Sequence, residues 1–366
     1  MEQLKVIISG GGTGGHIFPA LSIANELKAR IPGVDILFVG ARGRMEMEKV
    51  PTAGYHIVGL PVIGLPRKLS LRMIPFAWNL YRSMQKARKL VKDFQPDVAI
   101  GVGGYASGPV LKAASRKGIP TILQEQNSYA GVTNKLLSQK VNKICVAYEN
   151  MERYFPKGKL VLTGNPVRQN LIKKVNKEDA YKAFKLEPGK PVILILGGSL
   201  GARTINESVL ANLNRIYESG IQVLWQCGTI YYNNILERLN GRLRSTVHLH
   251  EFLSQMDLAF AAADLVISRA GAATISELCL LGKASILVPS PNVAEDHQTK
   301  NAMALVEKEA AVMVKDGEAV QDLFVKALDL VLDSKKLNEL AANSKKMARP
   351  NATADIVDVI LKEIEK

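Results

Sequence analysis

The chain has 366 residues, of which 47% are hydrophobic and 22% charged, and its formal net charge at pH 7 is +14. This length and hydrophobic content favour two domains, each with its own core. No apolar run approaches the ~20 residues that a membrane-spanning helix needs, so a transmembrane helix is excluded. The charge favours an anionic partner, which could be nucleic acid, acidic lipid or a phosphate-rich substrate, and the plain alternative is a basic surface that serves solubility.

Short apolar runs alternate with helical patterns along the chain, which predicts parallel sheets covered by helices on both faces. The strands expected in the first half are 4–9, 35–39, 56–60, 98–101, 121–124, 143–147 and 160–163. Those expected in the second half are 192–196, 222–226, 247–250, 265–268, 285–288 and 311–314. Helical patterns include 19–30, 203–218 and 353–364.

The first strand is followed by a glycine-rich stretch, Gly10–His16. A strand, a glycine loop and a helix together form the setting in which backbone N–H groups and the positive end of a helix dipole meet a phosphate. His16 lies at the helix entrance, where the reactive end of a bound ligand could lie. The second half repeats the pattern, because Gly197–Ala202 follows an apolar strand and precedes a helix.

The duplicated pattern predicts a domain boundary near Gly164. We expect an N-terminal domain over 1–163, a C-terminal domain over 164–349, and a final helix over 350–366 that packs back towards the N-terminal domain. The N-terminus runs straight into the first strand, so we expect no signal peptide and a cytoplasmic location. The three cysteines form no CxxC pair, which indicates neither a zinc site nor a redox pair.

One segment is basic and apolar at once: no Asp or Glu occurs from Lys49 to Lys92. Its helical spacing of large apolar residues would suit a core-facing stripe with solvated cations around it. That interpretation does not explain the missing acids, and nucleic acid would not require the apolar residues. We therefore predict an interfacial element against anionic lipid. The expected membrane contacts are Ile74, Phe76, Trp78, Arg67, Lys68, Arg72 and Arg82.

Gly10-x-Gly12-x-x-Gly15 is formally a dinucleotide fingerprint. An NAD site would need an acid after the second strand, where this chain has Arg42. Arg42 could meet a 2′-phosphate, so an NADP-dependent oxidoreductase remains an alternative. It leaves the second glycine loop unexplained.

Motifs spread over nearly the whole chain resemble those of GT-B glycosyltransferases, and specifically the peptidoglycan N-acetylglucosaminyltransferases of glycosyltransferase family 28. The matching motifs are Gly10–His16, Gly103–Gly108, Glu125–Asn127, Gly164–Arg168, Gly197–Ala202, Ser268–Glu277, and Asp296–Gln298 with Asn301. Their common order makes the resemblance more specific than any one glycine loop.

The resemblance implies an α/β protein of GT-B fold, with two Rossmann-like domains facing across a cleft. It implies inverting transfer of N-acetylglucosamine from UDP-GlcNAc to the 4-hydroxyl of the muramyl sugar of lipid I, which forms lipid II for the cell wall. It implies no cofactor and no essential metal. The implied partners are UDP-GlcNAc, lipid I and an anionic membrane surface, with no nucleic acid, at the cytoplasmic face of a bacterial membrane. Another UDP-sugar transferase, for example one with a diacylglycerol acceptor, remains the alternative within the fold.

The resemblance also implies site residues. Those for UDP-GlcNAc are Thr13, Gly14, Gly15, Asn127, Arg168, Ser199, Leu253, Ala272, Ala273, Thr274, Ile275, Ser276, Glu277 and Gln298. Those on the acceptor side are Gly12, Tyr105, Ser107 and Asn301.

Inversion by direct displacement needs a base on the acceptor hydroxyl. His16 is the candidate, because an imidazole titrates near working pH, and its alternative role is a ligand contact or helix cap. Glu125 is the rival, and its alternative role is a structural carboxylate that binds backbone amides. The chain departs from some relatives at Gln124, which removes a histidine, and at Leu200, which removes a glutamine contact to the donor.

Overall fold

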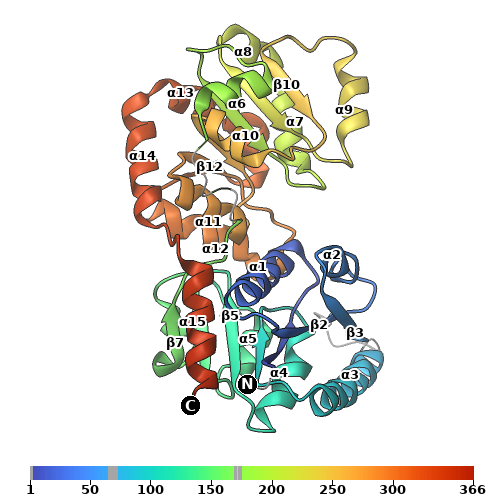
Figure 1. Cartoon of the computed structure of the whole chain (residues 1–366). Helices are drawn as coiled ribbons and strands as arrows, with labels where there is room; N and C mark the ends of the chain where they lie inside the picture. The colour runs from blue at the N-terminus through green and yellow to red at the C-terminus, as the bar shows by residue number, and fades with distance from the viewer. Residues whose placement is uncertain (1–2, 65–72, 169–170, 172–174) are drawn as a thin grey trace. The chain divides into compact units, whose positions relative to one another are not determined.

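The computed structural model describes residues 3–64, 73–168, 171 and 175–366. It divides the chain into two compact units, one formed by Met1–Val167 with Asn351–Lys366 and the other by Arg168–Pro350. Each unit is built around one parallel sheet with helices on its faces (Figure 1). The boundary follows Val167, a few residues after the expected one at 163.

The sheet of the N-terminal unit has the strand order β3-β2-β1-β4-β5-β6-β7, and all neighbouring strands are parallel. The strands are β1 (Lys5–Ser9), β2 (Asp35–Ala41), β3 (His56–Leu60), β4 (Val98–Gly101), β5 (Thr121–Glu125), β6 (Lys143–Val146) and β7 (Leu160–Leu162). The strand order reverses at β1, which lies between β2 and β4. In an open α/β sheet this switch point opens the crevice where ligands bind.

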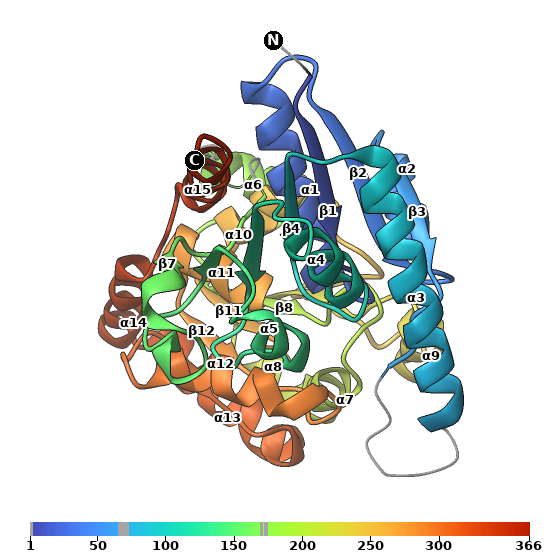
Figure 2. The same ribbon diagram turned by 90° about the horizontal axis from the view of Figure 1, so that it is seen from below.

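Helices cover both faces of this sheet because alternate strand residues point to opposite sides. Val6 and Ile8 pack with α1 (Gly14–Arg30), α2 (Glu46–Thr52) and α15 (Ala352–Ile364). Ile7 points the other way and packs with α3 (Met73–Phe94), α4 (Ser107–Ser115) and α5 (Val132–Leu137). Figure 2 shows α3 beside α4, and the two helices are in contact. Short 3₁₀ turns lie at Met151–Arg153 and Lys157–Lys159.

The sheet of the C-terminal unit has the order β10-β9-β8-β11-β12-β13 and is also parallel. Its strands are β8 (Val192–Leu196), β9 (Gln222–Gln226), β10 (Val247–His250), β11 (Leu265–Ser268), β12 (Ser285–Leu287) and β13 (Val312–Met313). Its helices are α6 (Lys177–Phe184), α7 (Arg203–Ala211), α8 (Leu213–Glu218), α9 (Tyr232–Leu239), α10 (Met256–Ala262), α11 (Ala272–Leu281), α12 (His297–Val306), α13 (Ala319–Leu332) and α14 (Ser334–Lys346). The strand order reverses at β8, as it does at β1.

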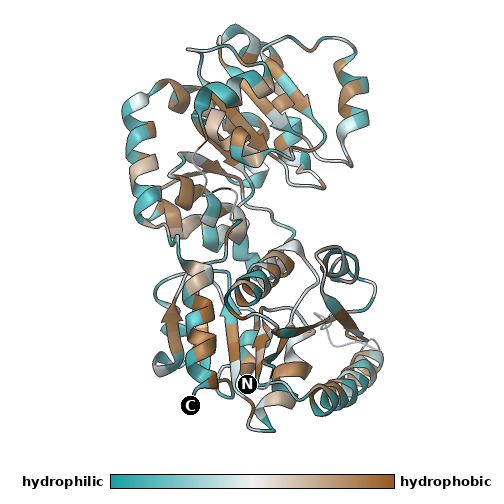
Figure 3. Cartoon of the chain, in the orientation of Figure 1, coloured by the Kyte–Doolittle hydropathy of each residue, from teal (hydrophilic) through white to brown (hydrophobic). Residues whose placement is uncertain are grey.

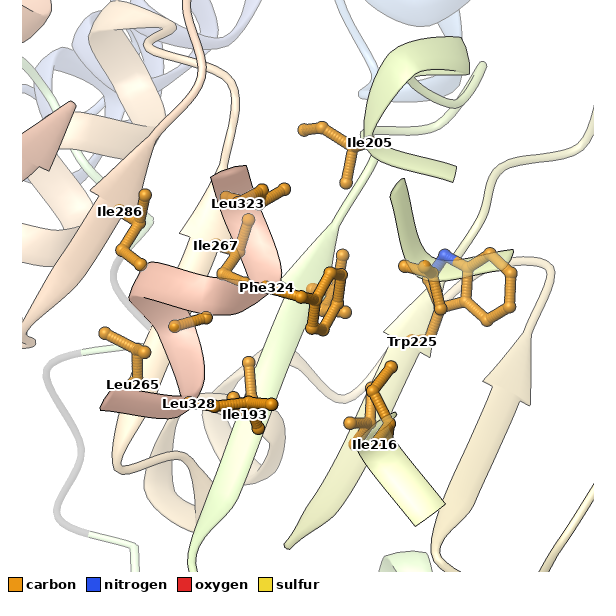
Figure 4. Packing of buried hydrophobic residues seen from close by; sticks show 14 of the residues in the cluster. Ile193, Ile205, Ile216, Trp225, Leu265, Ile267, Ile286, Leu323, Phe324 and Leu328 are labelled. Carbon is orange, nitrogen blue, oxygen red and sulfur yellow. The ribbon is translucent and has the colours of Figure 1, made fainter. Parts of the chain in front are cut away.

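The largest side chains in one core cluster of the C-terminal unit come from β9 and α13. Trp225 and Phe324 are fully buried with Ile193 and Ile267 (Figure 4). The Trp225 indole N–H donates to Asn206 Oδ1 at 3.0 Å, which satisfies its one polar atom in the core. Most of the strands are coloured as hydrophobic in Figure 3, as expected of strands that are buried on both faces.

The structure confirms a strand at each of the thirteen predicted places, with ends that differ by at most two residues. Two helix predictions were wrong at their ends. The helix expected from Pro19 begins at Gly14, because the Thr13 carbonyl already accepts the His16 and Ile17 N–H groups. The helix expected over 203–218 breaks at Asn212, whose side chain donates to Ser208 O at 2.9 Å.

The position of the last helix and the length of the helices bear on two of the predictions. The last helix, α15, packs on α1 within the N-terminal unit. Among the helices of the described residues, none has the length and apolar content to cross a bilayer.

Candidate functional site

The glycine loops of the two units occupy equivalent places. Gly10–Gly15 follows β1, and Gly197–Gly201 follows β8, so each loop lies at the switch point of its own sheet. The predicted site residues Thr13 and Ser199 are exposed on these loops. The carboxyl edge of each sheet is therefore where a ligand of that unit would bind.

The N-terminal loop is shaped by a buried carboxylate that the sequence did not single out. Glu46 of α2 is 1% exposed, and its two oxygens accept the N–H groups of Gly12 and Ala41, each at 2.9 Å. A Cβ on Gly11 would lie 2.1 Å from Glu46 Oε1, so glycine is required there to admit the carboxylate. The Gly12 amide is thus bound to a protein carboxylate, in the place where a dinucleotide fingerprint would offer it to a pyrophosphate.

His16 lies in the first turn of α1 and is held from two sides. Its Nδ1 is 3.0 Å from Oε1 of Gln126, just after β5. On its other side the loop after β4 approaches so closely that a Cβ on Gly103 would lie 2.8 Å from the imidazole Cε1. Both glycines of that loop have positive φ, +95° for Gly103 and +85° for Gly104. The close packing fixes the plane of the His16 ring at the carboxyl edge of the sheet.

In the Gly103–Gly108 motif, one of the two predicted site residues supports the loop and the other lies at the surface. Ser107 is fully buried, and its hydroxyl donates to Gly104 O at 2.8 Å, so its side chain supports the loop. Tyr105 is exposed, and its ring lies against Gly64. Of the two residues in this motif that were expected on the acceptor side, only Tyr105 presents its side chain at the surface.

Glu125, the rival base, is buried at the end of β5 with both oxygens engaged. Oε1 accepts from the backbone N–H and the side-chain amide of Asn127, at 3.1 and 3.3 Å. Oε2 accepts from the Gly131 N–H at 3.0 Å and the Asn134 amide at 2.8 Å. Four N–H donors around one carboxylate make it an organiser of the following loop, and they leave little room for an acceptor hydroxyl.

In the C-terminal unit, the glycine loop is tied to the loop after β9. The Thr229 N–H and hydroxyl both donate to Ser199 O, at 3.1 and 3.2 Å. A Cβ on Gly201 would lie 2.3 Å from Cys227 O, so this approach also requires glycine. The Leu200 side chain is exposed beside Ser199.

Two more predicted donor elements lie at the same edge. Leu253 is buried, and its N–H donates to Gln226 Oε1 at 3.1 Å. Helix α11 begins after Gly271, so the N–H groups of Ala272–Thr274 are first-turn amides that have no partner within the helix. The Ser276 hydroxyl donates to Ala272 O at 2.9 Å, within the same helix.

Arg168 and Glu277, which are 109 residues apart in sequence, form a bidentate pair. Arg168 Nε and Nη2 donate to the two Glu277 oxygens at 2.6 and 2.8 Å. Burial acts to lower the pKa of the Arg168 guanidinium, but the hydrogen bonds and charge of Glu277 outweigh it, and the pKa is raised. A ribose that binds Glu277 would therefore share its carboxylate with Arg168.

Gln298 and Asn301, both on α12, act on neighbouring loops. Gln298 Oε1 accepts from the Ser290 N–H at 2.8 Å. Asn301 was expected on the acceptor side, but it is fully buried in the C-terminal unit, where its amide donates to Ala270 O at 3.4 Å. The side chain thus supports the loop before α11, because a fully buried amide has no surface to offer a ligand.

The face of α3 that points away from the sheet carries large apolar residues. Ile74 is 70% exposed and Trp78 61% exposed, and the Trp78 ring stacks on that of Tyr81. Phe76 is half-buried and Arg82 is exposed. The core side of α3 is lined instead by Ser83, Ala87 and Val91, so the core-facing interpretation of the apolar stripe was wrong. Arg67, Lys68 and Arg72 lie outside the described residues.

Sequence reasoning missed Glu46 and Gln126 because each acts across a long stretch of chain. Glu46 bonds to Gly12, 34 positions away, and Gln126 bonds to His16, 110 positions away. It also missed Arg269, which donates to Asp316 and to the Val288 carbonyl, and so joins the loops after β11, β12 and β13. Gln126 lies in the Glu125–Asn127 motif and Arg269 in the Ser268–Glu277 motif, and this position was the only sign in the sequence that either residue belongs to the site.

Histidine and cysteine chemistry adds no second centre. Among residues 3–64, 73–168 and 175–366, no group of three or more His, Cys, Asp or Glu side chains is placed to hold a metal ion. His248 and His250 lie on β10, and burial lowers the pKa of both imidazoles. The three cysteines are buried.

Comparison with known proteins agrees with this architecture. The model of the glycosyltransferase family 28 N-terminal domain matches residues 6–146, and that of the family 28 C-terminal domain matches residues 192–356. A crystal structure of MurG from Acinetobacter baumannii superimposes with a TM-score of 0.79 at 30% identity, covering 98% of this chain and 99% of that one. This shows a GT-B fold of two Rossmann-like domains, and it overturns the nicotinamide alternative.

Two curated relatives cover almost the whole length of both chains. One from Parabacteroides distasonis is 55% identical over 100% of each chain, and one from Flavobacterium psychrophilum is 53% identical over 100% of this chain and 99% of its own. Both are named UDP-N-acetylglucosamine–N-acetylmuramyl-(pentapeptide) pyrophosphoryl-undecaprenol N-acetylglucosamine transferase. The chain therefore belongs to glycosyltransferase family 28, among the N-acetylglucosamine transferases of that name.

Proposed function

We propose that this chain transfers N-acetylglucosamine from UDP-GlcNAc to the 4-hydroxyl of the muramyl sugar of undecaprenyl-pyrophosphate-linked lipid I, and so forms lipid II for peptidoglycan. The observation that carries the proposal is identity of 53–55% over the full length to transferases named for this donor and acceptor. The same identity argues against a diacylglycerol acceptor. The two glycine loops, each at the switch point of its own sheet, suit a reaction between two phosphate-bearing substrates.

The C-terminal unit is the proposed donor site. The exposed Ser199 loop and the first-turn amides of α11 would hold the diphosphate of UDP-GlcNAc, because backbone N–H groups and helix dipoles both favour an anion there. The backbone of Leu253 would lie against uracil, and the Arg168–Glu277 pair would hold the ribose. Gln298 would read the sugar hydroxyls. These donors also stabilise the charge that develops on departing UDP.

The N-terminal unit is the proposed acceptor site, with His16 as the base. His16 would take the proton of the 4-hydroxyl as that oxygen attacks the anomeric carbon, while the bond to UDP breaks with its electron pair on the β-phosphate. The anomeric centre then inverts to the β configuration. Glu125 is the weaker candidate, because four N–H groups already bind its carboxylate. Gly12 and Tyr105 would line this site, and Thr13, Gly14 and Gly15 of the same loop would contact UDP-GlcNAc.

We further propose that α3 rests on an anionic membrane surface at the cytoplasmic face. What supports this is an exposed stripe formed by Ile74, Trp78 and Tyr81, next to the basic side chains of a segment that has no acid from Lys49 to Lys92. Large apolar side chains enter the headgroup boundary, and cations attract acidic lipid. The lipid tail of the acceptor could then stay in the bilayer.

The membrane proposal is tested with vesicles that contain acidic lipid. Replacing Trp78 and Tyr81 by Ser should lower vesicle binding at least tenfold, since each buried aromatic contributes about 2 kcal/mol, and should leave turnover of a short-chain acceptor within twofold. Leu332→Ser is the matched control, because Leu332 is 64% exposed on α13 of the other unit. Equal loss of binding and turnover, or binding unchanged, would contradict the proposal.

The transfer itself is tested with labelled UDP-GlcNAc and a short-chain lipid I analogue, with and without EDTA. We expect label in the muramyl product, at an unchanged rate in EDTA, and none in diacylglycerol. Transfer that stops in EDTA and returns with Mg²⁺ would overturn the metal independence alone. Binding of UDP-GlcNAc with no transfer to the lipid I analogue would overturn the acceptor.

A further inference from the structure

We infer that Gln126 is a positioning residue that fixes the tautomer of His16, with the proton on Nδ1 and the lone pair on Nε2. The catalytic consequence rests on the proposed role of His16 as base, whereas the tautomer itself does not. Gln126 lies just after β5 and is 2% exposed. Its side chain spans from the interior of the unit to the imidazole.

The orientation of the Gln126 amide is settled by what surrounds its nitrogen. Nε2 lies 2.7 Å from Val102 O, 3.3 Å from Gln124 O, and within hydrogen-bond distance of Gln124 Oε1. All three neighbours are oxygens that can only accept, so the NH₂ group has to point towards them. A flipped amide would set its oxygen against three oxygens and leave its NH₂ group facing the imidazole.

The Gln126 oxygen therefore faces His16 Nδ1, at 3.0 Å. A side-chain carbonyl oxygen accepts and cannot donate, so Nδ1 carries the proton in the neutral ring. The lone pair of a neutral imidazole with Nδ1–H is on Nε2. Nε2 is thus the nitrogen that can take the proton of the 4-hydroxyl, and the imidazolium that forms keeps its Nδ1–H bond to Gln126.

Two more buried amides hold Gln126 in this orientation. The Gln124 NH₂ donates to Asn165 Oδ1 at 3.0 Å, and the Asn165 NH₂ donates to the backbone carbonyl oxygen of Gln126 at 2.9 Å. Gln124 and Asn165 are 0% and 3% exposed. Turning any one amide would leave buried donors and acceptors mismatched, at a cost of about 1–3 kcal/mol each. The three amides therefore behave as one unit.

Among the described residues, the titratable side chains at this edge of the sheet include Glu46 of α2, Tyr105 after β4 and Glu125 of β5. Glu46 accepts the N–H groups of Gly12 and Ala41, and Glu125 accepts N–H groups from residues 127–134, at 2.8–3.3 Å. Tyr105 lies with its ring against Gly64. The group that faces Nδ1 is the neutral amide of Gln126, so exchanging that amide for a carboxylate changes the charge beside the ring without changing its shape.

The tautomer is read directly by ¹⁵N NMR of the full chain with labelled histidine, and His16→Gln identifies the His16 signals among five histidines. Above the titration of the ring, we expect the Nδ1–H tautomer in the wild-type protein. Gln126→Met, which keeps length and removes the acceptor, should release the ring to the Nε2–H tautomer that free histidine prefers. Gln139→Met, at an exposed glutamine of the same unit, should change nothing.

Kinetics provide the second measurement. Gln126→Met should lower kcat by about 10- to 100-fold with KM for UDP-GlcNAc unchanged, because only the proton transfer is impaired. Gln126→Glu should move the acidic limb of the kcat profile to higher pH, since a carboxylate beside Nδ1–H favours the imidazolium. A wild-type Nε2–H tautomer would overturn the inference whatever the activity. The Nδ1–H tautomer in a protein without transferase activity would instead overturn the proposed function and keep the inference.

Discussion

The side chain of Glu46 shows how one buried carboxylate can shape a ligand loop. It accepts the N–H groups of Gly12 and Ala41 at 2.9 Å each, and Gly11 has no Cβ to obstruct it. Glu46→Ala would leave these two N–H groups without their acceptor. We expect the free energy of unfolding to fall by about 2–4 kcal/mol and kcat/KM for the acceptor to fall at least tenfold.

Glu48→Ala is the control for this prediction, because Glu48 is exposed on the same helix and the change removes the same charge. It should leave both quantities near the wild-type values. The measurements are urea unfolding and steady-state kinetics. If the two variants behave alike, the loop does not depend on the Glu46 carboxylate.

Lys283 makes the free energy of unfolding change with pH in the alkaline range. Burial lowers the pKa of its ammonium from 10.5 to about 8, with Asp264 opposing and Lys177 adding to the shift. Between pH 8 and 10.5 the unfolded chain keeps this proton and the folded chain has lost it, so Lys283 makes stability rise with pH. The Lys283→Met variant has no ammonium at this position, so its unfolding free energy lacks this rise with pH.

The expected result is that the wild-type protein gains about 2 kcal/mol of unfolding free energy relative to Lys283→Met between pH 7.5 and 9.5. Chemical denaturation of both proteins at the two pH values measures it. A difference between the proteins that stays constant would show that Lys283 keeps its ordinary pKa in the folded chain.

Single residues of the site could be predicted only where a local motif contained them. His16, Ser199 and Glu277 belong to motifs of a glycine loop and the helix that follows, which can be recognised in the sequence. Glu46 lies in no such motif, and its partners are brought to it by the packing of α2 against β2. The role of Glu125 could not be chosen from the sequence, because its four donors come from the fold of residues 127–134.

At the scale of elements, the loop after β8 contains two glycines with positive φ and different surroundings. Gly201 has φ +93° and a Cβ there would lie 2.3 Å from Cys227 O, whereas Gly198 has φ +78° and open space around it. Gly198→Ala should cost about 1–2 kcal/mol through backbone strain alone. Gly201→Ala should cost at least twice as much, because the loop must also move away from β9.

Thermal and urea unfolding of the two variants tests this difference, and calorimetry with UDP-GlcNAc tests its consequence. We expect the donor to bind Gly201→Ala at least tenfold more weakly. An equal loss of unfolding free energy in the two variants would mean that the contact between the loops after β8 and β9 does not contribute to stability.

Strands were predicted better than helices for a physical reason. A parallel strand buried on both faces is a continuous apolar run, as in β1, β4, β8 and β11, and all thirteen predicted runs became strands. Helix ends depend on local hydrogen bonds that composition does not show, such as the Thr13 carbonyl that starts α1 five residues before Pro19. The apolar stripe of α3 had the spacing of a core helix, and only the structure shows that Ala87 and Val91 face the sheet.

At the scale of the whole molecule, the duplicated fold suits a reaction between two phosphate-bearing substrates. Each unit has its own switch point, its own glycine loop and its own core. The net charge of +14 suits an anionic donor, a pyrophosphate acceptor and an acidic membrane surface. Because such attraction is screened, vesicle binding should weaken as salt is raised.

The measurement that tests the central claim most directly is the structure of the product formed from UDP-GlcNAc and a short-chain lipid I analogue. Mass spectrometry should show one added N-acetylhexosamine, and NMR should place it on O4 of the muramyl sugar in the β configuration. An α linkage, attachment to another hydroxyl, or no added sugar in a protein that binds UDP-GlcNAc would contradict the account.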